Sequence, residues 1–382
     1  MKRLLGYGLE FIKRADMVLF ALCLTCSIFG LVVISSATAS YNTNRYVLVQ
    51  GFSLIIGIGL FVLLTIIDID IIADQWLILF AFEIGLLLIL AVFGTGMEES
   101  GNKAWLRFLG IGIQPTEIVK VIFVVLLSKH ATFLKNYRNI SAPLSVIQLA
   151  AHFGILFLMI VVISEDLGSA LIFLAIFLVI LFAAGVKLYW FLLGLAAVAA
   201  LTPLAWNYVL SDYQKDRILA PYLPDIIDPT NTGINFQPYQ SKIALASGQL
   251  TGTGLYQGTQ SQSSSLPQKH TDFIFAVIGE ELGMIGCIVV IALLVAIMVR
   301  CVYIGLKSRN TMNMLICFGM AGFLFFQTFE NIGMCIGIAP VIGLTLPFFS
   351  YGGSSLFATF AAMGIVSGIR FRPSPERFHS RT

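Results

Sequence analysis

Asp272 is the residue whose position most clearly suits chemistry in this 382-residue sequence, because it ends a long polar stretch where apolar residues resume. The polar stretch covers residues 211–272, and residues 273–278 are all hydrophobic. This change predicts the start of a helix, with Thr271 as a candidate N-cap. The first amides of a helix carry partial positive charge, which favours an ionised carboxylate. We therefore expect Asp272 to be an ionised group at the edge of an apolar region.

Glu117 and Lys120 form a second candidate group. The sequence Gln-Pro-Thr-Glu at 114–117 predicts a helix that begins at the proline or the threonine. Glu117 and Lys120 are then three residues apart on one helical face and can neutralise each other. Two interpretations stay open from these residues alone. The pair stabilises a buried helix end, or Lys120 binds a phosphate while Glu117 positions it.

Three further carboxylates stand at unusual positions. Asp166 lies at a break between two apolar runs with almost no loop, where a simple helix cap is the plainer interpretation. Glu280 and Glu281 lie about 12 Å along the helix expected to start near Asp272, at a rise of ~1.5 Å per residue. Carboxylates at that depth in an apolar region need partners.

A glycine-rich stretch at 247–258 could bring backbone amides close to an anion. It lacks the Gly-Lys-Ser/Thr ending of a phosphate-binding loop, so tight turns are the plainer interpretation. The six cysteines fall in or beside apolar runs, and the four histidines show no metal-binding spacing. A required ion would therefore be a hard, oxygen-bound cation such as Mg²⁺, with no residue assigned to it, and we expect no organic cofactor.

The composition identifies the setting in which these residues work. Hydrophobic residues make up 58% of the chain and charged residues only 11%, whereas soluble domains contain about 25% charged residues. Runs such as 17–34 and 46–67 carry no charge, and roughly 20 apolar residues cross a bilayer as a helix. Continuous apolar runs argue against an outer-membrane barrel. We therefore predict an all-α polytopic membrane protein.

We expect a single membrane domain over residues 1–382. It is a bundle of about ten transmembrane helices with a large extracytoplasmic loop, residues 211–272, before the eighth helix. The spans are predicted near residues 16–37, 46–67, 75–93, 116–134, 144–163, 167–184, 188–210, 273–299, 311–336 and 345–369.

The distribution of charge predicts the orientation. With ten spans, most of the 23 lysines and arginines fall on the side that holds both termini, which the positive-inside rule identifies as cytoplasmic. The apolar run after the basic N-terminus is too long for a signal-peptide core, so we expect an uncleaved signal anchor. Nucleic-acid binding is not expected, because no basic patch interleaved with aromatics lies outside the inner loops. Four motif-bearing segments then share the outer face: 94–117, 164–169, 211–272 and 337–353.

Residues 266–277, with the sequence Leu-Pro-Gln-Lys-His-Thr-Asp-Phe-Ile-Phe-Ala-Val, resemble the signature of the SEDS family (shape, elongation, division, sporulation). The resemblance covers nearly the whole chain and extends to Gly-Glu-Glu-Leu-Gly at 279–283, Gln-Pro-Thr-Glu at 114–117, Asp-Leu-Gly at 166–168, and residues 340–355. Residues 254–260 resemble the RodA elongation branch more than the FtsW division branch.

The resemblance implies a peptidoglycan glycosyltransferase of the bacterial cytoplasmic membrane. Such an enzyme polymerises lipid II into glycan strands during cell elongation, with a class B penicillin-binding protein as partner. The resemblance implies Asp272 as the general base on the 4-hydroxyl of the acceptor sugar, which attacks the anomeric carbon of a lipid-pyrophosphate donor. It also implies Glu117, Lys120 and Asp166 as substrate-binding cavity residues. Positive charge for the departing pyrophosphate is expected from Lys120, Arg107, loop amides or Mg²⁺.

The chain departs from the family pattern at several positions. Gln268 stands where glutamate is usual, and Asn-Phe-Gln at 235–237 replaces a more usual Gly-Tyr-Gln. Ala104 replaces a common arginine, which leaves Lys103 or Arg107 as substitutes for binding pyrophosphate.

The alternative function is a flippase for lipid II or another transporter of amphiphiles. A secondary transporter should have interrupted helices in two related halves and coupling residues near the bilayer midplane. No such halves are detectable in the sequence, and Asp272, which has the strongest motif, instead borders the outside. A third interpretation, a scaffold that only recruits a penicillin-binding protein, would leave the charged outer cleft without a role.

Overall fold

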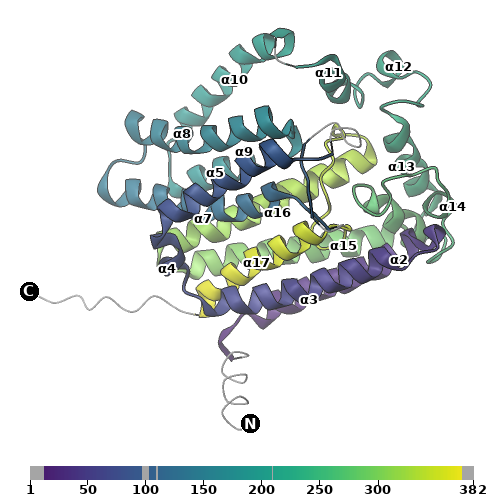
Figure 1. Cartoon of the computed structure of the whole chain (residues 1–382), viewed down its shortest axis with the longest axis horizontal. Helices are drawn as coiled ribbons and strands as arrows, with labels where there is room; N and C mark the ends of the chain where they lie inside the picture. The colour runs from purple at the N-terminus through teal and green to yellow at the C-terminus, as the bar shows by residue number, and fades with distance from the viewer. Residues whose placement is uncertain (1–12, 97–102, 109–110, 209, 372–382) are drawn as a thin grey trace, which may run out of the picture.

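The computed structural model describes residues 13–96, 103–108, 111–208 and 210–371, and most of these residues are helical. Helices dominate because only a helix satisfies its own backbone polar groups within an apolar run that crosses a membrane. Figure 1 shows most of them side by side in one bundle. The long helices are α2 (Met17–Ala37), α3 (Arg45–Ile66), α5 (Trp76–Phe93), α7 (Pro115–Tyr137), α8 (Pro143–Met159), α9 (Leu167–Ala184), α10 (Leu188–Tyr208), α15 (Ile274–Lys307), α16 (Thr311–Ile336) and α17 (Gly353–Phe371).

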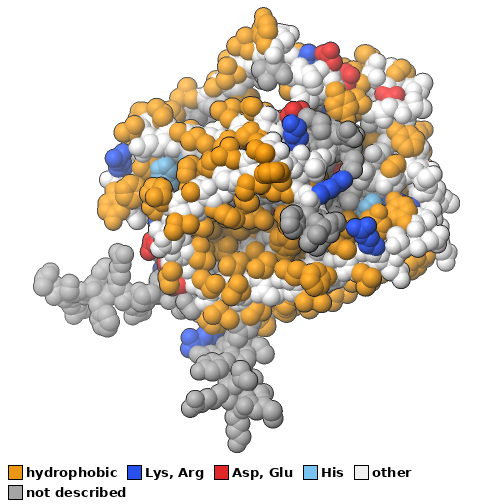
Figure 2. Space-filling model, viewed as in Figure 1, with side chains coloured by type: hydrophobic (Ala, Val, Ile, Leu, Met, Phe, Trp, Pro, Cys, Tyr) orange, Lys and Arg blue, Asp and Glu red, His pale blue; other side chains and the backbone are white. Residues whose placement is uncertain are grey.

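Nine of the helices in the described part of the chain are long and apolar enough to cross a membrane, with α8 counted through Ser164. The tenth long helix, α7, is 23 residues long but carries Glu117, Lys120, Lys129 and Lys135. It packs against α5, α9 and α16 inside the bundle. Hydrophobic side chains cover much of the surface over the long helices (Figure 2). The prediction of an all-α polytopic membrane protein with about ten transmembrane helices is confirmed.

The core of the bundle is built around α16, which packs against α7, α9 and α15, and around the pair of α3 and α17. Small residues permit these close approaches. Gly319 on α16 faces Val124 and Ile180, and Gly364 on α17 lies against the backbone of Phe61. In contrast, α10 stands apart from the other long helices in Figure 1, and almost all its side chains are exposed.

Two predicted spans differ from the structure at one end. The eighth continues to Lys307 instead of residue 299, and its Arg300 pairs with the buried Asp16 at 2.8 Å. The tenth begins at Gly353 instead of residue 345. Residues 345–352 are not helical because Pro347 lies within them and Phe348 has a left-handed φ of 67°.

The polar stretch 211–272 folds into short helices at one end of the bundle, which we call the loop end (Figure 1). They are α11 (Asp212–Leu219), α12 (Pro224–Ile227), α13 (Phe236–Ser247) and α14 (Thr259–Gln262). The remaining short elements are α4 (Ile69–Asp74), η1 (Ala39–Tyr41), η2 (Ile160–Ser164) and a two-stranded antiparallel sheet of β1 (Leu106–Phe108) and β2 (Ile111–Ile113).

Hydrogen bonds join the four motif-bearing segments in two pairs at the loop end. The backbone N–H of Lys103 donates to Ser164 at 2.9 Å. Gln114 donates to Asp166 at 3.4 Å. Ser350 donates to the carbonyl of Thr271 at 2.6 Å. Residues far apart in the sequence therefore meet at one end of the bundle.

Candidate active site

Asp272 lies in a turn, two residues before the first residue of α15. The backbone N–H groups of Thr271 and Phe273 both donate to the carbonyl of Gln268, at 3.3 and 3.1 Å. Phe273 occupies the N-cap position and makes no side-chain cap hydrogen bond. The prediction of Thr271 as N-cap is therefore wrong, because its hydroxyl donates back to Gln268, at 2.9 Å to the side-chain oxygen.

The backbone around Asp272 is fixed from two sides. The side-chain amide of Asn331 on α16 donates to the carbonyl of Asp272 at 2.7 Å and to that of Leu344 at 2.6 Å. On the other side, the N–H of Tyr351 donates to the carbonyl of His270 at 2.8 Å. The turn is thus held between the central helix and the segment that precedes α17.

The carboxylate of Asp272 is partly exposed, and it receives no hydrogen bond from the residues that the structure describes. Burial raises its pKa to about 6, and the positive charge of Arg217 opposes this rise. The expected stabilisation of the ionised form by helix amides is not observed, since the helix begins only at Ile274. A carboxylate with such a pKa is still mostly ionised at pH 7 and is a stronger base than an ordinary aspartate.

Gly343 lies beside this carboxylate. It has a left-handed φ of 70°, and a Cβ atom added there would lie 3.6 Å from Asp272 Oδ2. The left-handed backbone at this position favours a glycine, and a side chain there would be in van der Waals contact with the carboxylate.

The side chains of His270 and Lys269, the motif residues beside Asp272, contact other groups of the same protein. The imidazole of His270 packs among the rings of Tyr41, Tyr46 and Tyr351, with centroids 5.8, 4.7 and 5.6 Å away. Burial, and then the charge of Lys269, lowers the pKa of His270 to about 4. His270 is consequently neutral near pH 7, and its role here is to pack against the aromatic rings.

Glu117 and Lys120 form a closed ion pair. Lys120 Nζ lies 2.6 Å from Glu117 Oε2, donates to the Gln327 side-chain oxygen at 2.9 Å, and lies 4.9 Å from the centre of the Phe323 ring. Lys120 is 1% exposed and Glu117 4% exposed. In this structure the pair is therefore closed within the protein at the buried start of α7, and the binding of a phosphate by Lys120 stays a prediction.

Asp166 caps α9 and joins it to α7. Its carboxylate accepts from the Ser169 N–H at 3.0 Å and from the Ser169 hydroxyl at 2.6 Å, and Ser169 also bonds the Thr116 hydroxyl at 3.3 Å. Burial raises the pKa of Asp166, the hydrogen bonds from Ser169 lower it, and the negative charge of Glu117 raises it further. The structure thus brings Asp166 into the neighbourhood of Glu117.

Lys103 and Arg107 lie in and beside the small sheet. The carbonyl of Lys103 accepts from the Ser164 hydroxyl at 3.0 Å, and Arg107 is exposed in β1 opposite Gly112. This places both residues at the loop end, beside the start of α9.

Gln327 and Asn331 are site residues that the sequence analysis did not identify. They are four residues apart on α16, so they lie on one face. Gln327 donates to the carbonyl of Thr345 at 2.9 Å, next to the Leu344 carbonyl that Asn331 holds. The same residue accepts from Lys120, and the backbone of 344–345 therefore links the Lys120 ion pair to the Asp272 turn. Two amides at this spacing in an apolar span are the signal that could have revealed them.

Backbone amides of α14, just after the glycine-rich stretch, surround an anion, and this anion is Glu280. Its carboxylate accepts from the N–H groups of Gln260 and Ser261 at 2.8 and 2.7 Å. Glu281 accepts from the hydroxyls of Ser36 and Ser261 at 2.6 and 2.7 Å. The expected partners of these two glutamates are therefore the loop and α2.

The same loop completes an interruption in α15. Gly283 has φ 69° and ψ −167°, so the helix is broken there. The N–H of Met284 donates to the carbonyl of Gln249, and the N–H of Thr253 donates to that of Glu280, both at 2.9 Å. Broken backbone is tolerated within a membrane protein only where other protein groups or water satisfy it.

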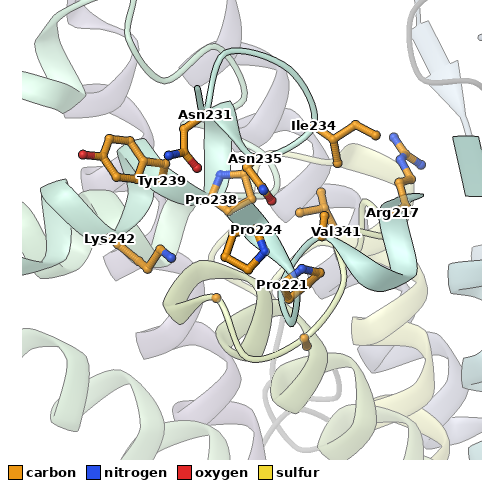
Figure 3. A pocket seen from close by; sticks show the side chains of 13 residues that line it. Arg217, Pro221, Pro224, Asn231, Ile234, Asn235, Pro238, Tyr239, Lys242 and Val341 are labelled. Carbon is orange, nitrogen blue, oxygen red and sulfur yellow. The ribbon is translucent and has the colours of Figure 1, made fainter. Parts of the chain in front are cut away.

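A pocket opens at the loop end between α11, α12, α13 and the chain that follows α16. Figure 3 shows Lys242 and Arg217 on opposite sides of it, with Asn235 between them in this view. Among the residues that the structure describes, no group of three or more His, Cys, Asp or Glu could hold a metal ion. The expected Mg²⁺ has no assigned ligands.

Known proteins are similar to this chain in sequence. A family model described as "Cell cycle protein" and named for FtsW, RodA and SpoVE matches residues 16–373. The chain is 35% identical over 381 residues to the probable peptidoglycan glycosyltransferase FtsW of Geobacter metallireducens, which covers 96% of this chain and 97% of that one. It is also 35% identical over 294 residues to the peptidoglycan glycosyltransferase MrdB of Escherichia coli K12, with 76% of each chain covered.

Two solved structures have a similar fold. A chain from a peptidoglycan synthase complex, studied for its coordination of polymerization and crosslinking, matches with a TM-score of 0.76 and 27% identity, over 93% of this chain and 97% of that one. The rod shape determining protein RodA of Thermus thermophilus matches with a TM-score of 0.66 and 26% identity, over 93% and 96% of the two chains.

Proposed function

Since the chain belongs to the FtsW/RodA/SpoVE family of cell cycle proteins, we propose that it is a peptidoglycan glycosyltransferase that polymerises lipid II into glycan strands. Relatives that match over most of their length carry the name of this activity. The observation that carries the proposal is the carboxylate of Asp272, which is partly exposed and has a pKa raised to about 6. These are the properties required of a general base near neutral pH.

In the proposed reaction, the acceptor 4-hydroxyl oxygen attacks the anomeric carbon of the donor while Asp272 takes the hydroxyl proton. The bond from the anomeric carbon to the pyrophosphate oxygen breaks, and its electron pair leaves with the lipid pyrophosphate. The configuration at the anomeric carbon is inverted. General-base assistance of this kind is typically worth about 10² to 10⁴ in rate.

We also propose a location, an orientation and a partner for the protein. The protein lies in the bacterial cytoplasmic membrane with both termini in the cytoplasm, and the loop end with Asp272 faces outward. A class B penicillin-binding protein is the proposed partner, and the similarity to a chain of a peptidoglycan synthase complex supports it. Residues 254–260 favour a role in elongation. A divalent cation such as Mg²⁺ would assist the departure of pyrophosphate.

A lipid II flippase is the second candidate, because the interruption of α15 at Gly283 is a feature that transporters use at their binding sites. Here, however, the loop of residues 249–254 forms hydrogen bonds with the backbone on both sides of the break. Those groups are consequently engaged within the protein, which favours the polymerase.

The test is reconstitution of the purified protein with lipid II and its partner, with polymer measured by gel electrophoresis. Asp272→Asn should lower the rate at least 100-fold. Asp212→Asn is the matched control, because the Asp212 side chain is 95% exposed on α11. Full polymerisation by Asp272→Asn would remove the base assignment. Transbilayer movement of lipid II in liposomes without polymer would support the flippase instead.

A further inference from the structure

Two histidines that are 22 residues apart in the sequence meet between α7 and α8. Nδ1 of His130 lies 3.4 Å from Nδ1 of His152, although the spacing of the histidines in the sequence did not predict a metal site. The pair lies toward the end of the bundle opposite the loop end, because His130 is in the last third of α7 and α8 starts soon after it. Both side chains are partly exposed, so neither is sealed inside the bundle.

The distance between the two nitrogens fits a shared metal ion better than a hydrogen bond. Hydrogen bonds from N–H groups are usually about 2.7–3.2 Å long, so 3.4 Å is long for a bond between the rings. A tetrahedral ion bound to two imidazoles at about 2.0–2.1 Å places their nitrogens about 3.3–3.4 Å apart. The ring centres are 5.6 Å apart, farther than the two nitrogens, so the Nδ1 edges face each other.

Two unpaired polar groups lie beside this pair. His152 Nε2 is buried and has no partner among the residues that the structure describes, and neither oxygen of Glu83, which is 0% exposed, has one. Glu83 lies one turn after Phe80 on α5, and the ring of Phe80 packs against that of His152 with centres 5.5 Å apart. Buried polar groups are rarely left without partners, so this cluster indicates a ligand.

A metal dication accounts for all of these groups together. A metal-bound histidine usually donates its second ring N–H to a carboxylate or a carbonyl, which fixes the orientation of the ring. His152 Nε2 and Glu83 are a donor and an acceptor of this kind. The negative charge of Glu83 also balances the charge of the ion, which would otherwise be costly within an apolar bundle.

A hydrogen bond between the two histidines is the competing interpretation. It places one ring N–H between the rings, but it leaves His152 Nε2 and Glu83 without partners. Lys129, the neighbour of His130 in the sequence, is not the counter-charge of Glu83, because it donates to Asp74 and to the carbonyl of Ala73, both at 2.7 Å. The competing interpretation therefore leaves the buried carboxylate unexplained.

We propose that His130 and His152 bind a first-row transition-metal dication such as Zn²⁺, with Glu83 as the carboxylate that orients His152 and balances the charge. Imidazole nitrogens suit such an ion better than the hard ion Mg²⁺. Since no three His, Cys, Asp or Glu side chains of the described residues could hold a metal ion together, water completes the coordination. The ion joins α7 to α8 at the end of α7 that lies away from Glu117 and Lys120. This inference is independent of the proposed reaction.

The first test uses the full chain without a polyhistidine tag, in nanodiscs, with Co²⁺ and Zn²⁺ as probes. One Co²⁺ per chain should give visible absorption bands, and Zn²⁺ should displace it and raise the unfolding temperature. Mg²⁺ at the same concentration should do neither. X-ray absorption of the zinc-loaded protein should show two imidazole nitrogens at about 2.0–2.1 Å. Zinc bound without imidazole ligands, or no binding at all, would overturn the proposal.

The second test compares zinc binding by variants in calorimetry, per folded molecule. His152→Ala should weaken binding at least tenfold and Glu83→Gln about 10- to 100-fold, whereas His130→Cys should retain it because a thiolate is also a zinc ligand. His270→Gln is the control, since the ring of His270 packs among tyrosines at the loop end. Unchanged binding by His152→Ala, or an equal loss in the control, would contradict the proposed site. Thermal unfolding without metal checks that each variant is folded.

Discussion

The side-chain amide of Asn331 donates to the backbone carbonyl of Asp272 at 2.7 Å, and so the candidate base is tied to the central helix of the bundle. The same nitrogen donates to Leu344 at 2.6 Å. One residue therefore sets the position of both the base and the chain segment beside it.

Asn331→Ala should lower the polymerisation rate about tenfold, because it releases the turn that carries Asp272. The measurement is the initial rate per folded molecule, with the folded fraction taken from thermal unfolding. Asn313→Ala is the control on the same helix, where a buried asparagine leaves its side-chain oxygen unpaired. An unchanged rate in Asn331→Ala would mean that the turn holds its geometry without this bond.

The rate constant kcat/KM should fall as the pH is lowered through about 6, since Asp272 must be ionised to accept a proton and its pKa is raised to about 6. The loss of the positive charge in Arg217→Ala should move the acidic limb of the pH–rate profile to higher pH, because the charge of Arg217 opposes the rise in the pKa of Asp272. A pH–rate profile of both proteins measures the shift. An acidic limb at the same pH in both would show that Arg217 does not act on Asp272.

Asp272 should also lower stability near neutral pH. Its pKa is higher in the folded than in the unfolded state, so the contribution to stability is fully present below the unfolded value near 4 and is lost as the pH rises through about 6. Asp272→Asn should therefore unfold at a higher temperature than the wild type at pH 7.5, and the difference should vanish near pH 4. A variant less stable than the wild type at pH 7.5 would contradict this.

Breaking the buried pair of Glu117 and Lys120 should be costly. Glu117→Ala leaves Lys120 buried without its counter-charge, and we expect a loss of about 3–5 kcal/mol in the free energy of unfolding. The exposed pair of Asp212 and Lys215 is the comparison, and Asp212→Ala there should cost less than about 1 kcal/mol. Denaturation of the two variants in one detergent measures both. Similar losses would mean that the Glu117 pair is not isolated from water.

Gly343→Ala should destabilise the protein and impair the reaction. Its φ of 70° disfavours a side chain, at a cost of about 1 kcal/mol, and the new methyl group would stand beside the Asp272 carboxylate. Gly85→Ala is the control, because a Cβ there meets nothing within 4 Å. A fully active Gly343→Ala would show that the segment can move away from Asp272.

The sequence predicted most of the helices because long uncharged runs have one stable form in a membrane. It placed the ninth span, for example, at residues 311–336, which are the bounds of α16. It misplaced the start of the tenth, since residues 345–352 are apolar enough to resemble a span. Hydropathy does not indicate that Phe348 adopts a left-handed φ of 67°.

The candidate site was predictable only in part. Asp166, Glu117 and Lys120 do lie close together, as their shared side of the membrane suggested. Gln327 and Asn331 were missed, because their role depends on backbone carbonyls of a non-helical segment that the sequence does not place. For Glu280 the sequence indicated only that partners were needed, and the structure supplies them as backbone amides of α14 in the same chain.

Because α15 is broken at Gly283, the membrane insertion of this span depends on the segment of the chain that is synthesised just before it. Residues 249–254 leave the ribosome first, and they must already be in place when the eighth span enters the bilayer, or polar main-chain groups would meet lipid. Exchanging this outer segment with that of a distant relative would therefore disturb membrane insertion as well as substrate handling.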